Sequence, residues 1–257
     1  SAARTEVRVR QWGADCRRWA RREERDRIRP HAPALRIRRA TRVVTELTFR
    51  TLPLPERSVA LEAQGAWTGC AAAASKLLDS NLDPTYLAAT PNGSPEGWCL
   101  RVGYEGFPET VEAQLGRSEA LLRECGLAAS GRREHAPAED AFAATFPSLH
   151  AVDFLLRTGV PLHRLRELVP HAQAQLAAPD LLADFGCGRL LAATPSLSGD
   201  SWRTLCQVTR DMNGHTVLER APATFADRYG AEEPPRPELA VMQALKKELD
   251  PHSVFAA

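Results

Sequence analysis

The sequence contains little lysine, no long apolar run and no closely spaced cysteine pair. Three of its 33 basic residues are lysines, so almost all positive charge is arginine. Because 32 acidic residues leave a formal net charge of +1, the chain as a whole has no strong electrostatic attraction for nucleic acid or anionic lipid. No stretch approaches the ~18 apolar residues of a membrane span, and the basic N-terminus lacks the apolar core of a secretory signal. We therefore expect a soluble, cytoplasmic chain with no nucleic-acid partner and no membrane span.

The cysteines are scattered and suggest no metal site. None forms a C-x-x-C pair, and no histidine stands at a spacing typical of zinc or iron–sulfur ligation. The simplest interpretation is reduced, mostly buried thiols, so no metal is predicted. The six residues are Cys16, Cys70, Cys99, Cys125, Cys187 and Cys206.

The first 42 residues differ in composition from the rest of the chain. They hold 14 arginines and no lysine, and their aliphatic residues follow no regular period. Three interpretations stay open: a basic arm that binds nucleic acid, a solvated or disordered tail, and a segment read in a shifted frame. Few aromatic residues besides Trp12 and Trp19 interleave the charge, which argues against the first.

From residue 43 onward, strand and helix patterns alternate. Residues 43–50 alternate in polarity and are β-branched, which predicts a strand that ends before Pro53 and Pro55. Further strands are predicted at residues 58–62, 98–104, 152–156, 181–192 and 216–219. Helices are predicted at residues 68–79 with Thr68 as N-cap, 108–125, 161–176 with a kink or break at Pro170, 198–212 and 237–249. The polar stretch 128–146 predicts a loop. This order indicates an α+β fold in which helices cover one face of an antiparallel sheet, as in a ferredoxin-like duplication.

Three segments carry a resemblance to a known enzyme family. The first, VVTELTFR at 43–50 with Pro53 and Pro55 after it, resembles the G-x-x-T-E-x-T-x-R…P-x-P signature of FAD-linked oxidases of the vanillyl-alcohol oxidase (PCMH) type. The second, LRVGYEG at 100–106, resembles a cap strand of the glycolate oxidase E subunit. The third, VMQALKKELDPHSVF at 241–255, resembles the family's closing helix and D-P turn. In order and spacing the three segments fit one C-terminal cap domain.

The resemblance implies a division of the chain into four parts. Residues 1–42 are an irregular Arg-rich segment, 43–55 the last strand of an FAD-binding domain, 56–240 the substrate cap, and 241–257 a helix that returns to the FAD domain. In the family, backbone groups around Val43, Val44 and Thr45 contact FAD, although Arg42 stands where the family has glycine. The family's P-x-G-x-G-T-S-x-x-G loop, whose N–H groups hold the pyrophosphate, is absent from the sequence. We therefore expect weak or no FAD binding by this truncated chain, and no activity on its own.

A frame shift would explain the unusual first segment. Upstream of the strand the family carries K-S-A-T-G-Y-D-L-x-R-L. Admissible codons for residues 24–31, read one base later, spell S-A-T-G-Y-D-L-T. A frame error in a GC-rich gene would also account for the excess of arginine, and the nucleotide sequence tests this hypothesis.

The candidate substrate ligand is Arg189. Residues 184–190 correspond to a cap loop that reads G-H-x-G-D-G-N-x-H in catalytic relatives; this chain keeps glycines and lacks the histidines, as the E subunit does. Arg189 could bind a carboxylate with two parallel hydrogen bonds, and an ordinary surface arginine is the open alternative. No catalytic residue is assigned, because His163, His171 and His215 have no carboxylate at a telling spacing.

The resemblance implies a component of an FAD-dependent oxidoreductase. Such an enzyme moves a hydride from a 2-hydroxy acid, such as glycolate or lactate, to the flavin. The implied partners are the glycolate oxidase-type D subunit and an iron–sulfur subunit. The alternative is a non-catalytic α+β cap or interaction module that works without flavin.

Overall fold

The computed structural model describes residues 54–94, 97–134, 152–230 and 238–252. The strand predicted at 43–50, the segment 1–42 and the FAD contacts at Val43, Val44 and Thr45 lie outside these residues. The predicted return of both chain ends to one flavin domain, and the four-part division built on it, therefore stay predictions.

The first half of the described chain is one β-α-β-β-α-β unit. Its elements are β1 (Arg57–Ala66), α4 (Trp67–Asp79), β2 (Tyr86–Pro91), β3 (Gly97–Gly106), α5 (Pro108–Glu124) and β4 (Ala128–Glu134). The strands lie side by side in the order β4-β1-β3-β2, and every neighbouring pair is antiparallel. This order and connectivity define the ferredoxin-like motif.

The second half repeats the same unit. Its elements are β5 (Phe154–Gly159), the 3-10 turn η2 (Leu162–Arg164), α7 (Leu165–Gln175), β6 (Asp180–Asp184), β7 (Arg189–Thr194), α8 (Gly199–Asp211) and β8 (His215–Arg220). Two further helices follow, α9 (Ala223–Tyr229) and α10 (Glu238–Leu249). Strands β6 and β2 pair edge to edge, so the two units form one eight-stranded sheet in the order β4-β1-β3-β2-β6-β7-β5-β8. The prediction of an α+β ferredoxin-like duplication is confirmed.

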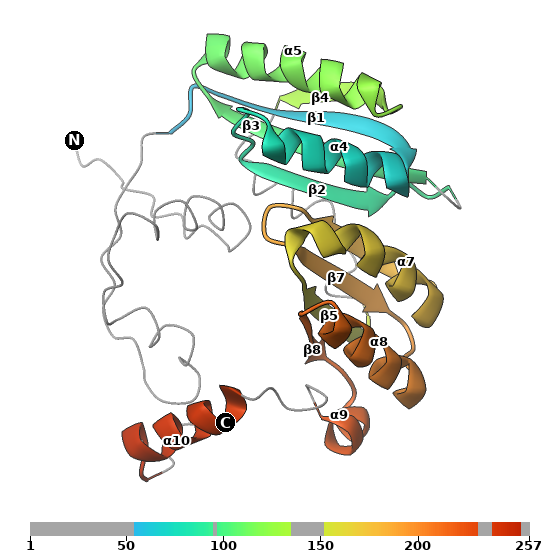
Figure 1. Cartoon of the computed structure of the whole chain (residues 1–257), viewed down its shortest axis with the longest axis vertical. Coiled ribbons are helices and arrows are strands. Elements are labelled where there is room, and N and C mark those ends of the chain that lie inside the picture. Colours follow the sequence, from blue (N-terminus) through green and yellow to red (C-terminus); the bar gives the residue numbers. More distant parts are fainter. Residues whose placement is uncertain (1–53, 95–96, 135–151, 231–237, 253–257) are drawn as a thin grey trace, which may run out of the picture.

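Four helices lie on one face of this sheet. Figure 1 shows α4 and α5 against the strands of the first unit, and α7 and α8 against those of the second. One hydrophobic core between sheet and helices runs through both units. Its strand residues alternate along the chain, for example Leu61 and Ala63 in β1 or Leu100 and Val102 in β3, as a sheet with one covered face requires.

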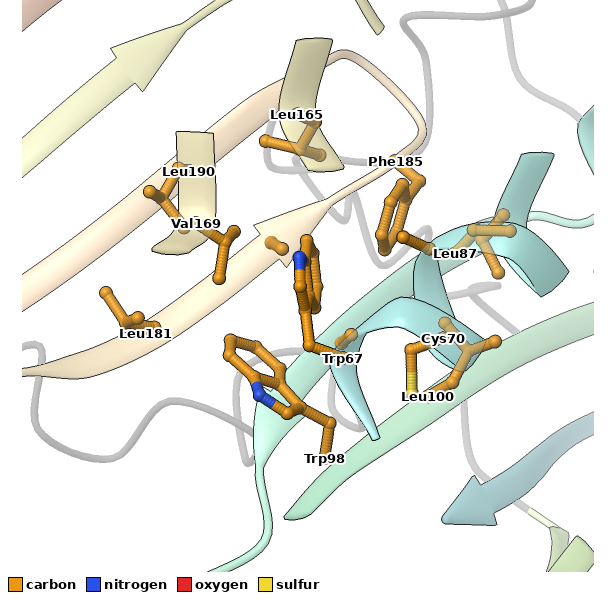
Figure 2. Packing of buried hydrophobic residues seen from close by; sticks show 14 of the residues in the cluster. Trp67, Cys70, Leu87, Trp98, Leu100, Leu165, Val169, Leu181, Phe185 and Leu190 are labelled. Carbon is orange, nitrogen blue, oxygen red and sulfur yellow. The ribbon is translucent and has the colours of Figure 1, made fainter. Parts of the chain in front are cut away.

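An aromatic cluster joins the two units. The Trp67 ring lies 4.6 Å from that of Trp98 and stacks on Phe185, 5.7 Å away, at the end of β6 (Figure 2). The backbone N–H of Phe185 donates to the carbonyl of Leu87 in β2 at 2.9 Å, beside the two ladder pairs between β2 and β6. Side chains from both halves therefore meet at the seam, and the core is continuous across it.

Trp67 also compensates for the proline inside α7. Pro170 has no N–H, so the carbonyl of Arg166, one turn earlier, receives no helical hydrogen bond from it. The indole Nε1 of Trp67 donates to that carbonyl at 2.9 Å. The helix consequently runs unbroken from Leu165 to Gln175, and the predicted break at Pro170 is wrong.

Other details of the sequence prediction are corrected by the structure. The stretch 181–192 is a hairpin of β6 and β7 around its glycines, and residues 128–134 form strand β4 at the sheet edge. Helix α4 is capped at Ala66 and not at Thr68, without a side-chain hydrogen bond. Ser198 caps α8, its hydroxyl accepting from the Ser201 N–H at 3.0 Å. Strand β2 and helix α9 were not predicted.

Candidate functional site

A row of charged side chains crosses the sheet on the face that these four helices leave uncovered. Consecutive ladders place Glu62, Arg101, Ala88, Asp184, Arg189, Gly159 and His215 directly opposite one another across β1, β3, β2, β6, β7, β5 and β8. Their chain neighbours, such as Leu61, Leu100 and Leu190, belong to the core. Because side chains alternate between the faces of a strand, the row points away from the helices.

The first charged group of this row joins two arginines to one carboxylate. Glu62 Oε1 accepts a hydrogen bond from Arg101 Nε at 3.0 Å and forms an ion pair with Arg133 Nε, on the edge strand β4, at 3.4 Å. Arg101 also donates from Nη1 to the Thr90 hydroxyl at 3.0 Å. Glu62 and Arg101 are mostly buried, with side chains 13% and 22% exposed, whereas Arg133 is 63% exposed. Hydrogen bonds to Glu62 and to Thr90 therefore fix the orientation of the Arg101 guanidinium.

The charges of this cluster affect the pKa values of two neighbouring side chains, Cys99 and Tyr86. Burial raises the pKa of the Cys99 thiol; Arg101 and Arg133 oppose that shift, and Glu62 adds to it. Burial likewise raises the pKa of the Tyr86 phenol, with Arg101 opposing and Glu62 adding. Arg101 is therefore electrostatically coupled to side chains of β2 and β3 on this face, and Arg133 to Cys99 of β3. Cys99 and Tyr86 are held in their neutral forms.

The second charged group contains the predicted substrate ligand. Arg189 Nη2 lies 3.1 Å from Asp184 Oδ2, and the Asp184 side chain is 3% exposed. Asp184 also accepts from the backbone N–H of Gly186 at 2.8 Å and from the Cys187 thiol at 3.0 Å. The Asp184 carboxylate thus stabilises the turn between β6 and β7 through contacts with Gly186, Cys187 and Arg189. The structure places Arg189 on the uncovered face, as a ligand-binding role would need; that role stays a prediction.

The other candidates do not assemble into a metal site or a catalytic cluster. His215 reaches the row, and a Cβ added to Gly159 would lie 3.0 Å from its Cε1, whereas His163 lies in η2 and His171 in α7. Within the described ranges no group of three or more His, Cys, Asp or Glu side chains could hold a metal ion. None of the described helices combines the length and the apolar character that crossing a bilayer needs.

The first strand-to-helix junction of the described chain does not fit the phosphates of FAD. The β1–α4 junction is a strand-to-helix turn with two glycines, Gly65 and Gly69, as a phosphate cradle would have. However, a Cβ at Gly65 or Gly69 would lie 2.4 or 3.1 Å from the Leu127 side chain. Close packing against Leu127 accounts for both glycines, so we derive no reaction step through FAD in this chain.

Comparison with known proteins finds structural similarity only. No protein-family model and no curated protein matches the sequence. An alkyldihydroxyacetonephosphate synthase matches with 12% identity and a TM-score of 0.49, over 79% of this chain and 44% of that one. The VAO-type flavoprotein MtVAO615 of Myceliophthora thermophila C1 matches with 16% identity and a TM-score of 0.47, over 77% and 46%. The xylooligosaccharide oxidase of the same organism matches with 14% and 0.47, over 81% and 56%.

This similarity is limited in extent and in strength. The chain spans about half the length of the solved structures it matches. The similarity thus includes VAO-type flavoproteins at low identity, while the specific likeness to the glycolate oxidase E subunit stays a prediction. With TM-scores and identities this low, it establishes neither an activity nor a cofactor nor a substrate for this chain.

Sequence reasoning missed Glu62, Arg101 and Arg133 as candidate site residues. Arg101 lies inside the motif at 100–106, but nothing in the sequence shows that β1 and β4 would bring Glu62 and Arg133 beside it. The available signal was the charge itself, since Glu62 and Arg101 each stand between two apolar residues in the middle of a strand. A charged residue inside a buried strand is uncommon unless it is paired.

Proposed function

We propose that this chain is the substrate cap of an FAD-dependent oxidoreductase that acts on a small 2-hydroxy acid. The observation that carries the proposal is the row of paired charges on the sheet face opposite the four helices. A sheet in a globular protein normally buries at least one face against another layer, and the helices of this chain supply one such layer. The opposite face offers guanidinium groups suited to a carboxylate-bearing ligand.

The face opposite the four helices also holds apolar residues. Leu182 and Ala193 are fully buried there and pack with Val152, Leu155 and Leu191 in a cluster separate from the main core. Apolar side chains beside a few polar groups are typical of ligand sites. A flavin-binding domain lying against this face would enclose a substrate between the two layers.

Each partner in the proposed enzyme has a distinct task. The flavin, bound when its domain is present, accepts the hydride from the substrate. The cap's arginines bind and orient the carboxylate, so that the carbon carrying the hydroxyl faces the flavin domain. Closure of the cap excludes water from the reacting groups. The glycolate oxidase-type D and iron–sulfur subunits are the proposed partners, and glycolate or lactate the proposed substrate.

A spectroscopic experiment tests this proposal. The protein is purified from its natural host together with whatever it binds, and its absorbance is recorded near ~450 nm, where oxidised flavin absorbs. The proposal expects a yellow preparation that is bleached by glycolate or lactate under anaerobic conditions, and not by acetate. A colourless, folded preparation that co-purifies with no flavoprotein contradicts it.

The second candidate is a non-catalytic interaction module, which a feature of α10 favours. Val241, Leu245 and Leu249 lie one turn apart on α10 and are exposed by 62%, 37% and 43%. An apolar stripe at this spacing is the side by which an amphipathic helix packs on another surface. Co-purification with a partner that contains no flavin would support this candidate over the first.

A further inference from the structure

We propose that Arg101 and Arg133, oriented by Glu62, form a binding site for the carboxylate of a small organic anion. The inference deepens the proposed function, since it locates the group that recognises an acidic substrate, and it rests on that function only for the identity of the acid. It places recognition in the first unit of the sheet and not at Arg189.

The charge balance distinguishes the two arginine groups of the row. At the second, Arg189 faces Asp184, so one positive charge meets one negative charge. At the first, Arg101 and Arg133 share the single carboxylate of Glu62, which leaves one net positive charge. Glu105 is the next carboxylate along β3 on this face, four residues from Arg101 and thus about 13 Å away along the strand. Among the described residues, the local excess of positive charge therefore lies at the Glu62 cluster.

The geometry leaves donors for an incoming anion. Arg101 uses Nε for Glu62 and Nη1 for Thr90, and Arg133 uses Nε for Glu62. Among the described residues no hydrogen bond occupies Arg101 Nη2 or the two terminal nitrogens of Arg133. Since Glu62 and Thr90 fix the plane of Arg101, little side-chain entropy is lost when a ligand binds it.

The residues beside these donors on the same face have short side chains. Ala60 and Gly131 are the residues next to Arg133 and Glu62 in the ladder between β1 and β4, and Ala88 stands beside Arg101. A further glycine, Gly103, lies under the Tyr86 ring, since a Cβ there would be 2.1 Å from Tyr86 Cε1. Small residues and one aromatic ring thus surround the paired guanidinium groups, an arrangement suited to a compact, partly apolar acid.

The test measures carboxylate binding without any flavin. Glycolate, lactate and acetate are titrated into the full chain and followed by calorimetry, with inorganic phosphate and neutral glycolamide as comparison ligands. We expect the carboxylates to bind and glycolamide not to bind. Phosphate binding tighter than carboxylate binding would identify a phosphate site and overturn the proposal, and so would the absence of carboxylate binding.

Two variants of one strand provide the matched comparison. Arg133→Ala should weaken carboxylate binding at least about tenfold, because a charge-assisted contact is lost. The control is Arg132→Ala on the same exposed edge strand, since Arg132 pairs with Glu112 and Glu119 of α5 on the helix-covered side. It removes the same charge and should leave the affinity within about twofold. Equal losses from both variants would mean that only general charge attracts the anion, which overturns the proposal.

The remaining variants locate the site and protect against misfolding. Arg101→Gln should abolish binding, and thermal melting of each variant shows whether it is folded. Should a folded Arg189→Gln alone abolish binding while Arg101→Gln and Arg133→Ala retain it, the carboxylate lies at Arg189 and the proposal is wrong. Carboxylate binding through Arg101 in a protein that never carries flavin would leave this site standing and refute the proposed oxidoreductase. If glycolate still bleached the flavin in both the Arg101→Gln and the Arg133→Ala variants, the oxidoreductase would be supported and this binding site refuted.

Discussion

Replacing Gly188 with alanine should destabilise the protein much more than replacing Gly93. Both glycines have left-handed backbone angles, φ of +66° and +87°, which cost an alanine about 1–2 kcal/mol. A Cβ at Gly93 meets nothing within 4 Å, whereas one at Gly188 would lie 2.3 Å from the carbonyl oxygen of Val160. In the alanine variant the two backbone segments at residues 160 and 188 would have to move apart. This would strain the hydrogen bond from the Val160 N–H to the Gly188 carbonyl, which is 2.9 Å long in the protein.

The magnitude follows from adding these contributions. Loss of most of one backbone hydrogen bond costs about 1 kcal/mol net, so Gly188→Ala should cost about 2–3 kcal/mol in total and Gly93→Ala about 1–2 kcal/mol. Urea denaturation of both variants measures the difference, provided that the slope of the transition is unchanged. Two variants that agree within about 0.5 kcal/mol would refute the claim that the β6–β7 turn packs against the end of β5.

Three further perturbations probe the core, the surface charges and the thiols. Phe185→Ala should cost about 3–5 kcal/mol in the free energy of unfolding and alter tryptophan fluorescence through Trp67; an unchanged stability would exclude the stacked seam. Arg132 and Arg57 lower the pKa of Glu112 below its usual 4.5, so the stability that Glu112 contributes is present above that pH and lost as pH falls through its lower folded value. Glu112→Gln should accordingly flatten the acid side of a stability–pH curve, and an unaltered curve would contradict the pairing. Burial raises the pKa of Cys70 to about 12, so iodoacetamide at pH 8 should label it only after unfolding, as mass spectrometry of the native protein would reveal.

The helices were predictable from the sequence because their apolar faces repeat locally. Helix α8 has a Ser198 cap and an apolar face that ends in a turn, and α5 begins at Pro108 and closes at Gly126, whose φ is +73°. Each of these signals depends only on neighbours within a few residues. The α+β fold class could be inferred from the same local patterns, although strands β2 and β4 of the repeated unit were not predicted.

Strand β4 could not be predicted because its own residues do not encode it. All seven of its residues are exposed, and no alternation marks a buried face. Its extended form depends on the ladder with β1 and on ion pairs such as that of Arg132 with Glu119 at 2.7 Å. A pattern-based prediction is blind to such tertiary stabilisation. The candidate site was missed for the same reason, since Arg133 joins Glu62 only after β4 has paired.

The hydrogen bond from Trp67 to the Arg166 carbonyl has a consequence for biosynthesis. The indole is made about a hundred residues before the proline whose missing N–H it replaces, and domains are assembled from the N-terminus as the chain emerges. A preformed first unit can therefore act as a template on which the imperfect helix completes its first turns. A gene rearrangement that placed the second unit ahead of the first would reverse that order. Helix α7 would then be synthesised before the Trp67 indole that donates to its Arg166 carbonyl.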